Sequence, residues 1–385
     1  MAMTVTFCLT MIVSSKIFEA KVDAVNQKEI MYDKISDIDK AVRQNYYTTV
    51  DDNQVLENMS DGYVKGLGDS ESKYYTSNQV GEYQLVMDGK IIGIGVDFIK
   101  SREDSGYMKI YKVYTDSPAD VRGIVAGDKI TSINGVSTIG MSLDTAYEML
   151  SGVSGTTVDI SYLHENSEKR ISLTHKAYDA PSISYVKEEE YGYISISAFT
   201  KRTASELDYA VKSLTDAGVT SLVIDLRDTI SNDFDSAAAA ADVLLKEGTT
   251  MYAVYKDGER KVLYTSNKSA TNLPIVLITN SRTGYASEMF AMMLKDVAGA
   301  KTVGTTTMGK GTLQKMFRLP DGSGVELTVA TLSPVTSDSY NDAGIVPDYE
   351  KELDSSIESF HTLPMSADPQ VQRAFEVAKN LVSSK

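Results

Sequence analysis

Short apolar runs alternate with amphipathic segments through the second half of the chain. The runs "YISISAF", "SLVIDL" and "PIVLIT" are typical of buried strands. Between and after them, "ASELDYAVKSLTDAG", "DSAAAAADVLL" and "YASEMFAMMLKDV" carry apolar residues at helical spacing. Apolar strands that alternate with helices predict crossover units and a mostly parallel sheet with helices on both faces. We therefore expect an α/β core over residues 178–350.

The pattern changes on either side of this core. Residues 22–88 are helical in pattern, with Ile30, Ile35, Ile38 and Val42 near a 3.6-residue period, and no catalytic cluster is visible there. Residues 89–177 read as short strands and turns, and residues 351–385 as a polar linker with one helix. The sequence thus predicts a multidomain α/β (α+β) protein: a helical N-terminal segment, a small β-rich domain, the core and a helical tail.

Composition limits the function and its setting. The formal net charge is −15 and the Lys and Arg residues are scattered, which argues against a nucleic-acid partner because phosphate binding needs clustered cations. The one cysteine, Cys8, lies in the apolar opening of residues 1–21 and excludes a disulfide framework. We interpret this opening as a signal peptide or membrane anchor, so the chain is expected to be secreted or membrane-anchored, outside the cytoplasm. The alternative is a buried N-terminal strand of a cytoplasmic protein.

Two common kinds of site are poorly supported. "GTTTMGKGT" resembles a phosphate-binding loop, but its eighth position is Gly311 and a hairpin pattern follows in place of a helix. His164, His175 and His361 have no Cys or carboxylate at ligand spacing, so each is expected to be a solvated surface histidine. We therefore predict no nucleotide, metal or other cofactor.

The β-rich segment contains a candidate peptide-binding turn. Gly93, Ile94, Gly95 and Val96 form "GIGV", where small glycines let backbone amides converge on a carboxylate. Together with "SPADVRGIVAGDKITSINGVS", this turn resembles a PDZ domain of the bacterial type, against the alternative of an unrelated small β unit. The resemblance implies that the turn receives a chain terminus and that a strand edge pairs with the bound peptide.

The order of motifs along the chain carries a second resemblance. The PDZ-like unit is followed by "VIDLR", "PIVLITN", "ASEMFAMMLKD", "VGTTTMGKGTLQ" and "AGIVPD". This set resembles the carboxyl-terminal-processing, or tail-specific, serine peptidases over nearly the whole chain. The resemblance implies a Ser–Lys dyad in which a neutral Lys takes the Ser proton. It puts Lys310 at the position of the base and Gln314 at that of the amide that orients it.

The chain departs from that pattern at two points. The residue before "ASE", where the resemblance places the nucleophile, is Tyr285, and the spacing to Lys310 allows no shift that would recover a serine. After "IDLR" the family carries Asn-Pro-Gly-Gly, whose glycine amide helps to form the oxyanion hole. Residues 229–232 (Thr-Ile-Ser-Asn) stand there instead.

These departures predict a member of the family that binds extended or C-terminal polypeptide segments and has lost its peptidase activity or retains very little. Its partners would be polypeptide C-termini, unfolded protein segments or an active homologous peptidase. We expect Tyr285 to fill the former catalytic cleft and to bond to Lys310. Two alternatives remain. The chain is an active peptidase that uses the hydroxyl of Ser281, Thr283 or Ser287 with Lys310, or it is a non-catalytic scaffold whose PDZ groove is unused.

Overall fold

The fold is taken from a computed structural model that describes residues 18, 28–100, 106–165, 167–267, 271–354, 357 and 359–383. Apart from Phe18, the expected leader of residues 1–21 lies outside the described residues. The chain divides into two compact units, residues 1–63 and 64–385. In the first unit, residues 28–45 are helical and α2 (Asp52–Lys65) begins.

A six-stranded sheet forms the centre of the second unit, in the order β10-β11-β12-β16-β18-β21. Only β10 (Ile183–Glu188) is antiparallel to its neighbour, β11 (Tyr191–Ile196). The other strands, β12 (Ser221–Asp225), β16 (Ile275–Thr279), β18 (Lys301–Gly304) and β21 (Tyr349–Glu350), pair in parallel. The predicted fold class, a mostly parallel sheet within a multidomain α/β protein, is confirmed.

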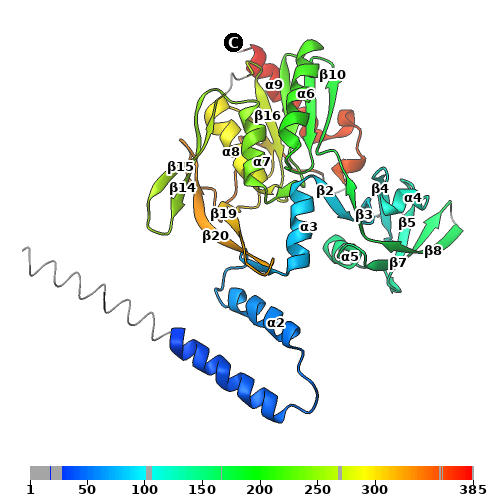
Figure 1. Cartoon of the computed structure of the whole chain (residues 1–385). Helices are drawn as coiled ribbons and strands as arrows, with labels where there is room; N and C mark the ends of the chain where they lie inside the picture. The colour runs from blue at the N-terminus through cyan, green and yellow to red at the C-terminus, as the bar shows by residue number, and fades with distance from the viewer. Residues whose placement is uncertain are drawn as a thin grey trace, which may run out of the picture. The chain divides into compact units, whose positions relative to one another are not determined.

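Successive side chains of the central strands supply two separate cores. Leu222 and Ile224 of β12 pack into the larger cluster with helices α6 (Thr203–Asp216), α7 (Phe234–Asp242) and α8 (Ala286–Ala298). Val223, between them, packs with α9 (Pro369–Ser383) in the second cluster. Because side chains alternate across a strand, an unbroken apolar run fills both faces of the sheet. Figure 1 shows α6, α7 and α8 grouped together around β16.

A second, antiparallel sheet lies in the same unit and brings distant segments together. It contains β1 (Lys73–Tyr75), β14 (Gly248–Tyr255), β15 (Arg260–Ser266), β19 (Thr312–Arg318) and β20 (Gly324–Ser333). Strand β1 pairs with β20, and β19 with β20. The hairpin β19–β20 follows "GKG" directly, so the structure bears out the rejection of a phosphate-binding loop, which needs a helix there.

The small β-rich domain enters and leaves through one pair of strands. β2 (Lys90–Gly93) pairs antiparallel with β9 (Lys176–Asp179). The other strands are β3 (Val96–Lys100), β4 (Met108–Val113), β5 (Lys129–Ile133), β6 (Val136–Ser137), β7 (Thr157–His164) and β8 (Ser167–Thr174). Helices α4 (Pro118–Val121) and α5 (Leu143–Leu150) complete it, and α3 (Ser77–Met87) precedes it. Strand β3 is an edge strand of its sheet, which leaves one side of its backbone open.

A buried ion network ties the tail to the end of β12. Arg227 Nη2 lies 2.6 Å from Asp225 Oδ2 and Arg227 Nη1 lies 2.8 Å from Asp368 Oδ2, and these side chains are at most 3% exposed. Arg227 Nη1 also donates to Gln370 Oε1 at 2.9 Å. Removal of the guanidinium would leave two buried carboxylates without a cation, which is costly.

We expect Arg227→Leu to destabilise the protein by about 3–5 kcal/mol, measured by denaturant unfolding at neutral pH. Arg373→Leu is the matched control. That side chain is 39% exposed and pairs with Glu376 on α9, so its loss is expected to cost less than about 1 kcal/mol. Equal effects of the two substitutions would contradict a structural role for the Arg227 network.

Candidate functional site

Tyr285 occupies a sharp turn between a strand and a helix. It ends β17 (Gly284–Tyr285), which pairs in parallel with β13 (Ile230–Ser231), and α8 begins at the next residue. Its φ is 58° and its ψ is −118°. Residues other than glycine adopt such a backbone at a cost of about 1–3 kcal/mol, so the surrounding structure must hold it there. Several hydrolases use a strained strand-to-helix turn to expose a nucleophile.

Glu288 fixes this turn to the loop that carries Lys310. Its carboxylate has no solvent exposure and accepts hydrogen bonds from the Tyr285 amide at 3.2 Å and the Thr307 hydroxyl at 2.5 Å. It also accepts from the amides of Gly309 at 2.6 Å and Lys310 at 2.8 Å. Burial raises the pKa of Glu288 above its usual range, against the effect of these donors. One carboxylate thus sets the spacing between Tyr285 and Lys310.

Glu71 joins the side chains of Tyr285 and Lys310. Lys310 Nζ lies 2.7 Å from Glu71 Oε1, and the Tyr285 hydroxyl donates to Glu71 Oε2 at 2.5 Å. Lys310 Nζ is 5.9 Å from the centre of the Tyr285 ring. The expected bond from Tyr285 to Lys310 is therefore wrong: the two side chains meet through a shared carboxylate.

This arrangement sets the charge of each group. The hydrogen bond to Glu71 raises the pKa of Lys310 above 10.5, and the nearby carboxylates add to that effect. Burial and then Glu71 raise the pKa of Tyr285 above 10.0. Burial alone would raise the pKa of Glu71, but hydrogen bonds from Lys310 and Tyr285 hold it below 4.5. Near neutral pH the site therefore holds an ammonium, a phenol and a carboxylate.

Short-range hydrogen bonds hold Glu71 in place. Asp69 accepts from the Glu71 amide at 3.0 Å and from the Ser72 hydroxyl at 2.6 Å. Ser72 in turn accepts from the Thr328 amide of β20 at 3.2 Å. No catalytic cluster was expected in residues 22–88, but one residue of this segment, Glu71, contributes a carboxylate to the site. The only local signal was the Asp69–Ser72 turn ahead of a β-rich run.

Gln314 lies near the site but forms no hydrogen bond to Lys310. Its Nε2 donates to the hydroxyls of Thr312 at 2.8 Å and Thr328 at 3.3 Å. Its Oε1 is buried and has no hydrogen-bond partner among the described residues. The structure therefore brings Tyr285 and Lys310 together with Glu71 and leaves Gln314 beside them.

The segment that replaces the family's glycines is held by its side chains. Thr229 is fully buried and its hydroxyl donates to the Ile196 carbonyl at 2.5 Å. Ser231 pairs with Tyr285 across the two-stranded ladder, and its hydroxyl donates to the Phe199 carbonyl at 3.3 Å. These side chains anchor the segment in which the resemblance implies glycines.

None of the alternative hydroxyls forms a hydrogen bond with Lys310 in the described structure. Thr283 is buried and donates to the Leu226 carbonyl at 2.8 Å. Ser287 is buried, and its hydroxyl has no hydrogen-bond partner among the described residues. Ser281 is exposed on the loop ahead of Tyr285.

Two buried amides of the "GIGV" turn have no hydrogen-bond acceptor among the described residues. Gly95 has a φ of 86°, and a Cβ added there would lie 2.0 Å from the Cβ of Ser117. The carbonyls of Ile94 and Gly95 accept from the amides of Ala119 at 2.8 Å and Tyr114 at 3.0 Å. No acceptor for the Ile94 or Gly95 amide lies among the described residues. Gly93 and Val96 end β2 and begin β3, so the turn stands at the open end of an edge strand.

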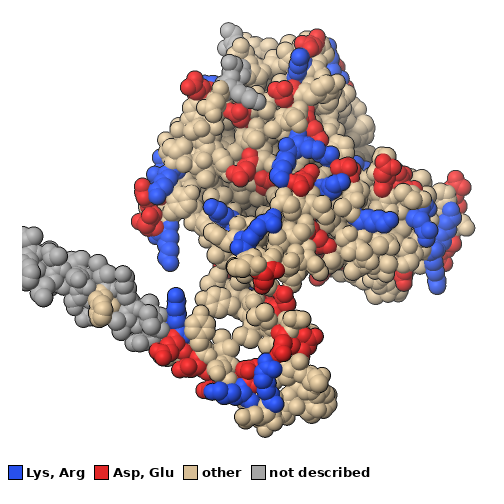
Figure 2. Space-filling model, viewed as in Figure 1, with Lys and Arg blue, Asp and Glu red and all other residues tan. Residues whose placement is uncertain are grey.

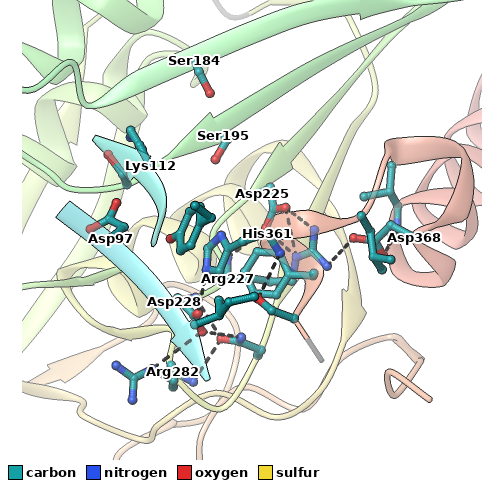
Figure 3. A pocket seen from close by; sticks show the side chains of 18 of the residues that line it. Asp97, Lys112, Ser184, Ser195, Asp225, Arg227, Asp228, Arg282, His361 and Asp368 are labelled. Atoms are coloured by element: carbon teal, nitrogen blue, oxygen red, sulfur yellow. Dashed lines mark hydrogen bonds and ion pairs between the residues drawn. The ribbon is translucent and has the colours of Figure 1, made fainter. Parts of the chain in front are cut away.

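A cavity of about 1360 Å³ lies between this domain and the carboxyl ends of β11, β12 and β16. Figure 3 shows Asp97 and Lys112 on one wall, with Ser195, Asp228, Arg282 and His361 across from them. His361 Nε2 lies 3.0 Å from Asp228, and its ring stacks on Tyr111 at 4.8 Å. Arg282, three residues before Tyr285, lies 3.2 Å from Asp144 of α5. The cavity thus reaches the loop that leads to Tyr285.

His361 is exposed, as expected, but His175 is not on the surface. His175 is 2% exposed and lies 2.9 Å from the Leu150 carbonyl. His164 lies 2.8 Å from Asp128, so it and His361 each pair with a carboxylate distant in sequence. These partners lie 36 and 133 residues away, so spacing could not predict them. Within the described chain, no group of three His, Cys, Asp or Glu residues is suited to a metal ion.

Comparisons with known proteins agree with the two resemblances. Residues 190–351 match Peptidase family S41, and residues 109–162 match the PDZ domain. A CtpA-like serine protease of Staphylococcus epidermidis is 28% identical over 357 residues, 91% of this chain and 71% of that protein. The carboxy-terminal processing protease CtpA of Bacillus subtilis is 28% identical over 326 residues, 84% of this chain and 69% of that protein.

The fold has a solved counterpart. The structure of a photosystem II D1 C-terminal processing protease aligns with a TM-score of 0.53 and 22% identity, over 80% of this chain and 84% of that one. At that identity the match supports the fold alone. The resemblance to carboxyl-terminal-processing peptidases with a PDZ domain is confirmed.

The Glu71 bridge predicts a particular dependence of stability on pH. Because the pKa of Glu71 is lower in the folded state, the stability that it contributes is present above about pH 4.5 and lost as pH falls further. Because the pKa of Lys310 is raised, the contribution is also lost at pH values above 10.5. Lys310 is 35% exposed, so we expect a difference of about 1 kcal/mol between wild type and Glu71→Gln at neutral pH.

Denaturant unfolding of both proteins from pH 3 to pH 7 measures this difference. It is expected to be constant near neutral pH and to shrink in acid. A difference that grows as the pH falls would contradict the bridge.

Proposed function

Since the chain belongs to peptidase family S41 and carries a PDZ domain, we propose that it binds extended or C-terminal polypeptide segments and has lost peptidase activity, or retains very little. The observation that carries this proposal is the Glu71 bridge. It occupies both the side chain at the nucleophile position, Tyr285, and the candidate base, Lys310.

The base of such a dyad has to be a neutral amine near pH 7. Enzymes obtain one by burial or by a neighbouring cation, either of which lowers the pKa of lysine. Lys310 has the opposite environment, because Glu71 accepts a hydrogen bond from its ammonium and raises its pKa. It therefore stays protonated and cannot accept a proton from a nucleophile.

The nucleophile and the oxyanion site are impaired as well. The Tyr285 phenol donates to a carboxylate, and burial and Glu71 both disfavour the phenolate. Residues 229–232 carry no glycine, and the loss of one oxyanion donor alone costs roughly 10²- to 10³-fold in rate. The Glu71 bridge and the missing glycines therefore both favour binding over catalysis.

The peptide-binding parts remain in place. The Ile94 and Gly95 amides lack acceptors among the described residues, and such amides can receive a terminal carboxylate. The open edge of β3 can pair with an extended backbone. The adjoining cavity leads from this domain to Arg282, close to Tyr285 (Figure 3).

The proposal includes a location and partners. We assign residues 1–21 to an export signal or membrane anchor on their apolar pattern, which places the chain outside the cytoplasm. Among the described residues, no helix is both long and apolar enough to cross a membrane.

On the face shown in Figure 2, basic and acidic side chains are interspersed. Partners would be polypeptide C-termini, unfolded segments or an active homologous peptidase that this chain regulates.

We predict that wild type degrades an unfolded protein such as casein no faster than Lys310→Ala does. The reason is that Lys310 is an ammonium held by Glu71, so its removal takes away no base. Gel and mass-spectrometric analysis of long incubations measures the rates. Turnover by wild type that Lys310→Ala abolishes would contradict the proposal, and Ser281→Ala would then test the exposed hydroxyl as nucleophile.

We also predict binding of peptides through a free C-terminus. Amidation of the C-terminus removes a charge-assisted contact. The affinity of the amidated peptide, measured by calorimetry, should therefore be about tenfold or more below that of the same peptide with a free carboxylate. Gly95→Ala should abolish binding, because the new Cβ would collide with Ser117. Gly123→Ala is the matched control, since Gly123 also has a positive φ but has open space around it.

Both variants are first checked for folding by circular dichroism. Equal affinity for the free and amidated peptides would rule out carboxylate capture by the turn.

A further inference from the structure

Glu71, Tyr285 and Lys310 form a hydrogen-bonded bridge, which we call the lock. Glu71 is 214 residues from Tyr285 and 239 from Lys310 in sequence, yet one carboxylate oxygen serves each of them. We propose that Glu71 is a positioning residue that holds the Lys310 ammonium in the site, so that a serine restored at position 285 would still find no base. This inference rests on the proposed function and extends it: restoring the nucleophile alone would leave Lys310 bound to Glu71.

Several contacts make Glu71 a fixed part of the site. Its side chain is only 15% exposed, and its amide is held by Asp69. The next residue, Ser72, accepts from the Thr328 amide, and β1 then pairs with β20. Side-chain and ladder hydrogen bonds therefore hold the segment from Asp69 to Tyr75 against the second sheet. In this position the Glu71 carboxylate lies within hydrogen-bond distance of Lys310 Nζ.

The contacts of Gln314 support the interpretation that Glu71 has replaced it as the hydrogen-bond partner of Lys310. Its Oε1 is buried without a donor, and a buried acceptor left unsatisfied costs about 1–3 kcal/mol. Gln314 pairs with Thr328 across β19 and β20, and Thr328 also contacts the Glu71 segment through Ser72. The side-chain amide of Gln314 thus lies next to the segment that carries Glu71, which binds Lys310.

The lock predicts how readily Lys310 reacts as an amine. Only the neutral amine attacks acetic anhydride, so the labelling rate of Lys310 at a fixed pH reports its neutral fraction. Peptide mass spectrometry gives the rate for each lysine. Glu71→Gln should raise the rate for Lys310 about tenfold at pH 8, because loss of the carboxylate that accepts from Lys310 lowers its pKa and enlarges its neutral fraction. The plateau rate at high pH reports access alone and corrects for any change in exposure.

A matched control distinguishes the effect of the Glu71 hydrogen bond from that of a nearby negative charge alone. Asp342 is a second carboxylate that raises the pKa of Lys310, but it forms no hydrogen bond with Lys310 in the described structure. Its φ is 62°, which asparagine tolerates. Asp342→Asn should change the rate much less than Glu71→Gln. Equal effects of the two variants would overturn the lock.

The tyrosine variant completes the test. Tyr285→Ser should leave the labelling rate of Lys310 close to that of wild type, whereas Tyr285→Ser/Glu71→Gln should raise it about tenfold. A rate raised by Tyr285→Ser alone would overturn the proposal that Glu71 holds the lysine. Labelling does not depend on peptide cleavage. Activity in wild type would therefore refute the proposed function without deciding the lock, and the labelling result would decide the lock alone.

Discussion

One carboxylate, Glu71, determines what the site can do. It lies between a cation and a phenol, and each of the three groups stabilises the protonation state of the others. The ammonium of Lys310 keeps Glu71 ionised, and Glu71 keeps Lys310 protonated and the Tyr285 hydroxyl in its neutral form. A lysine base needs a site that disfavours its charge. This site favours that charge through a hydrogen-bonded partner at 2.7 Å.

Contacts other than the bridge hold the backbone of the site in place. Tyr285 stays in a strained backbone conformation, and Glu288 holds its amide and the Lys310 loop with four hydrogen bonds. Strain of this kind persists only where surrounding contacts impose it. The "GIGV" turn and the cavity lined by β3 are likewise formed without Tyr285. The proposed peptide-binding turn and the Lys310 site therefore rest on different residues.

The sequence predicted the features that repeat along the chain or depend on local pattern. The buried strands and their helices, the hairpin after "GKG" and the proximity of Tyr285 to Lys310 all followed from periodicity, turn residues or motif order. Glu71 could not be found in this way, because its partners lie more than 200 residues away and no spacing links them. The carboxylate partners of His164 and His361 were missed for the same reason. Gln314 was placed near the site, but its hydrogen bonds depend on the register of β19 and β20.

The charge state of Lys310 in the unaltered protein is the most direct test of this account. NMR titration of the lysine side chains, with Lys310 assigned by Lys310→Arg, measures its pKa without any substrate. Lys310 is expected to titrate above the ordinary value of 10.5, because Glu71 stabilises the ammonium. A midpoint at about 7–8, the range of a tuned general base, would show that the site is poised for catalysis and would contradict the account.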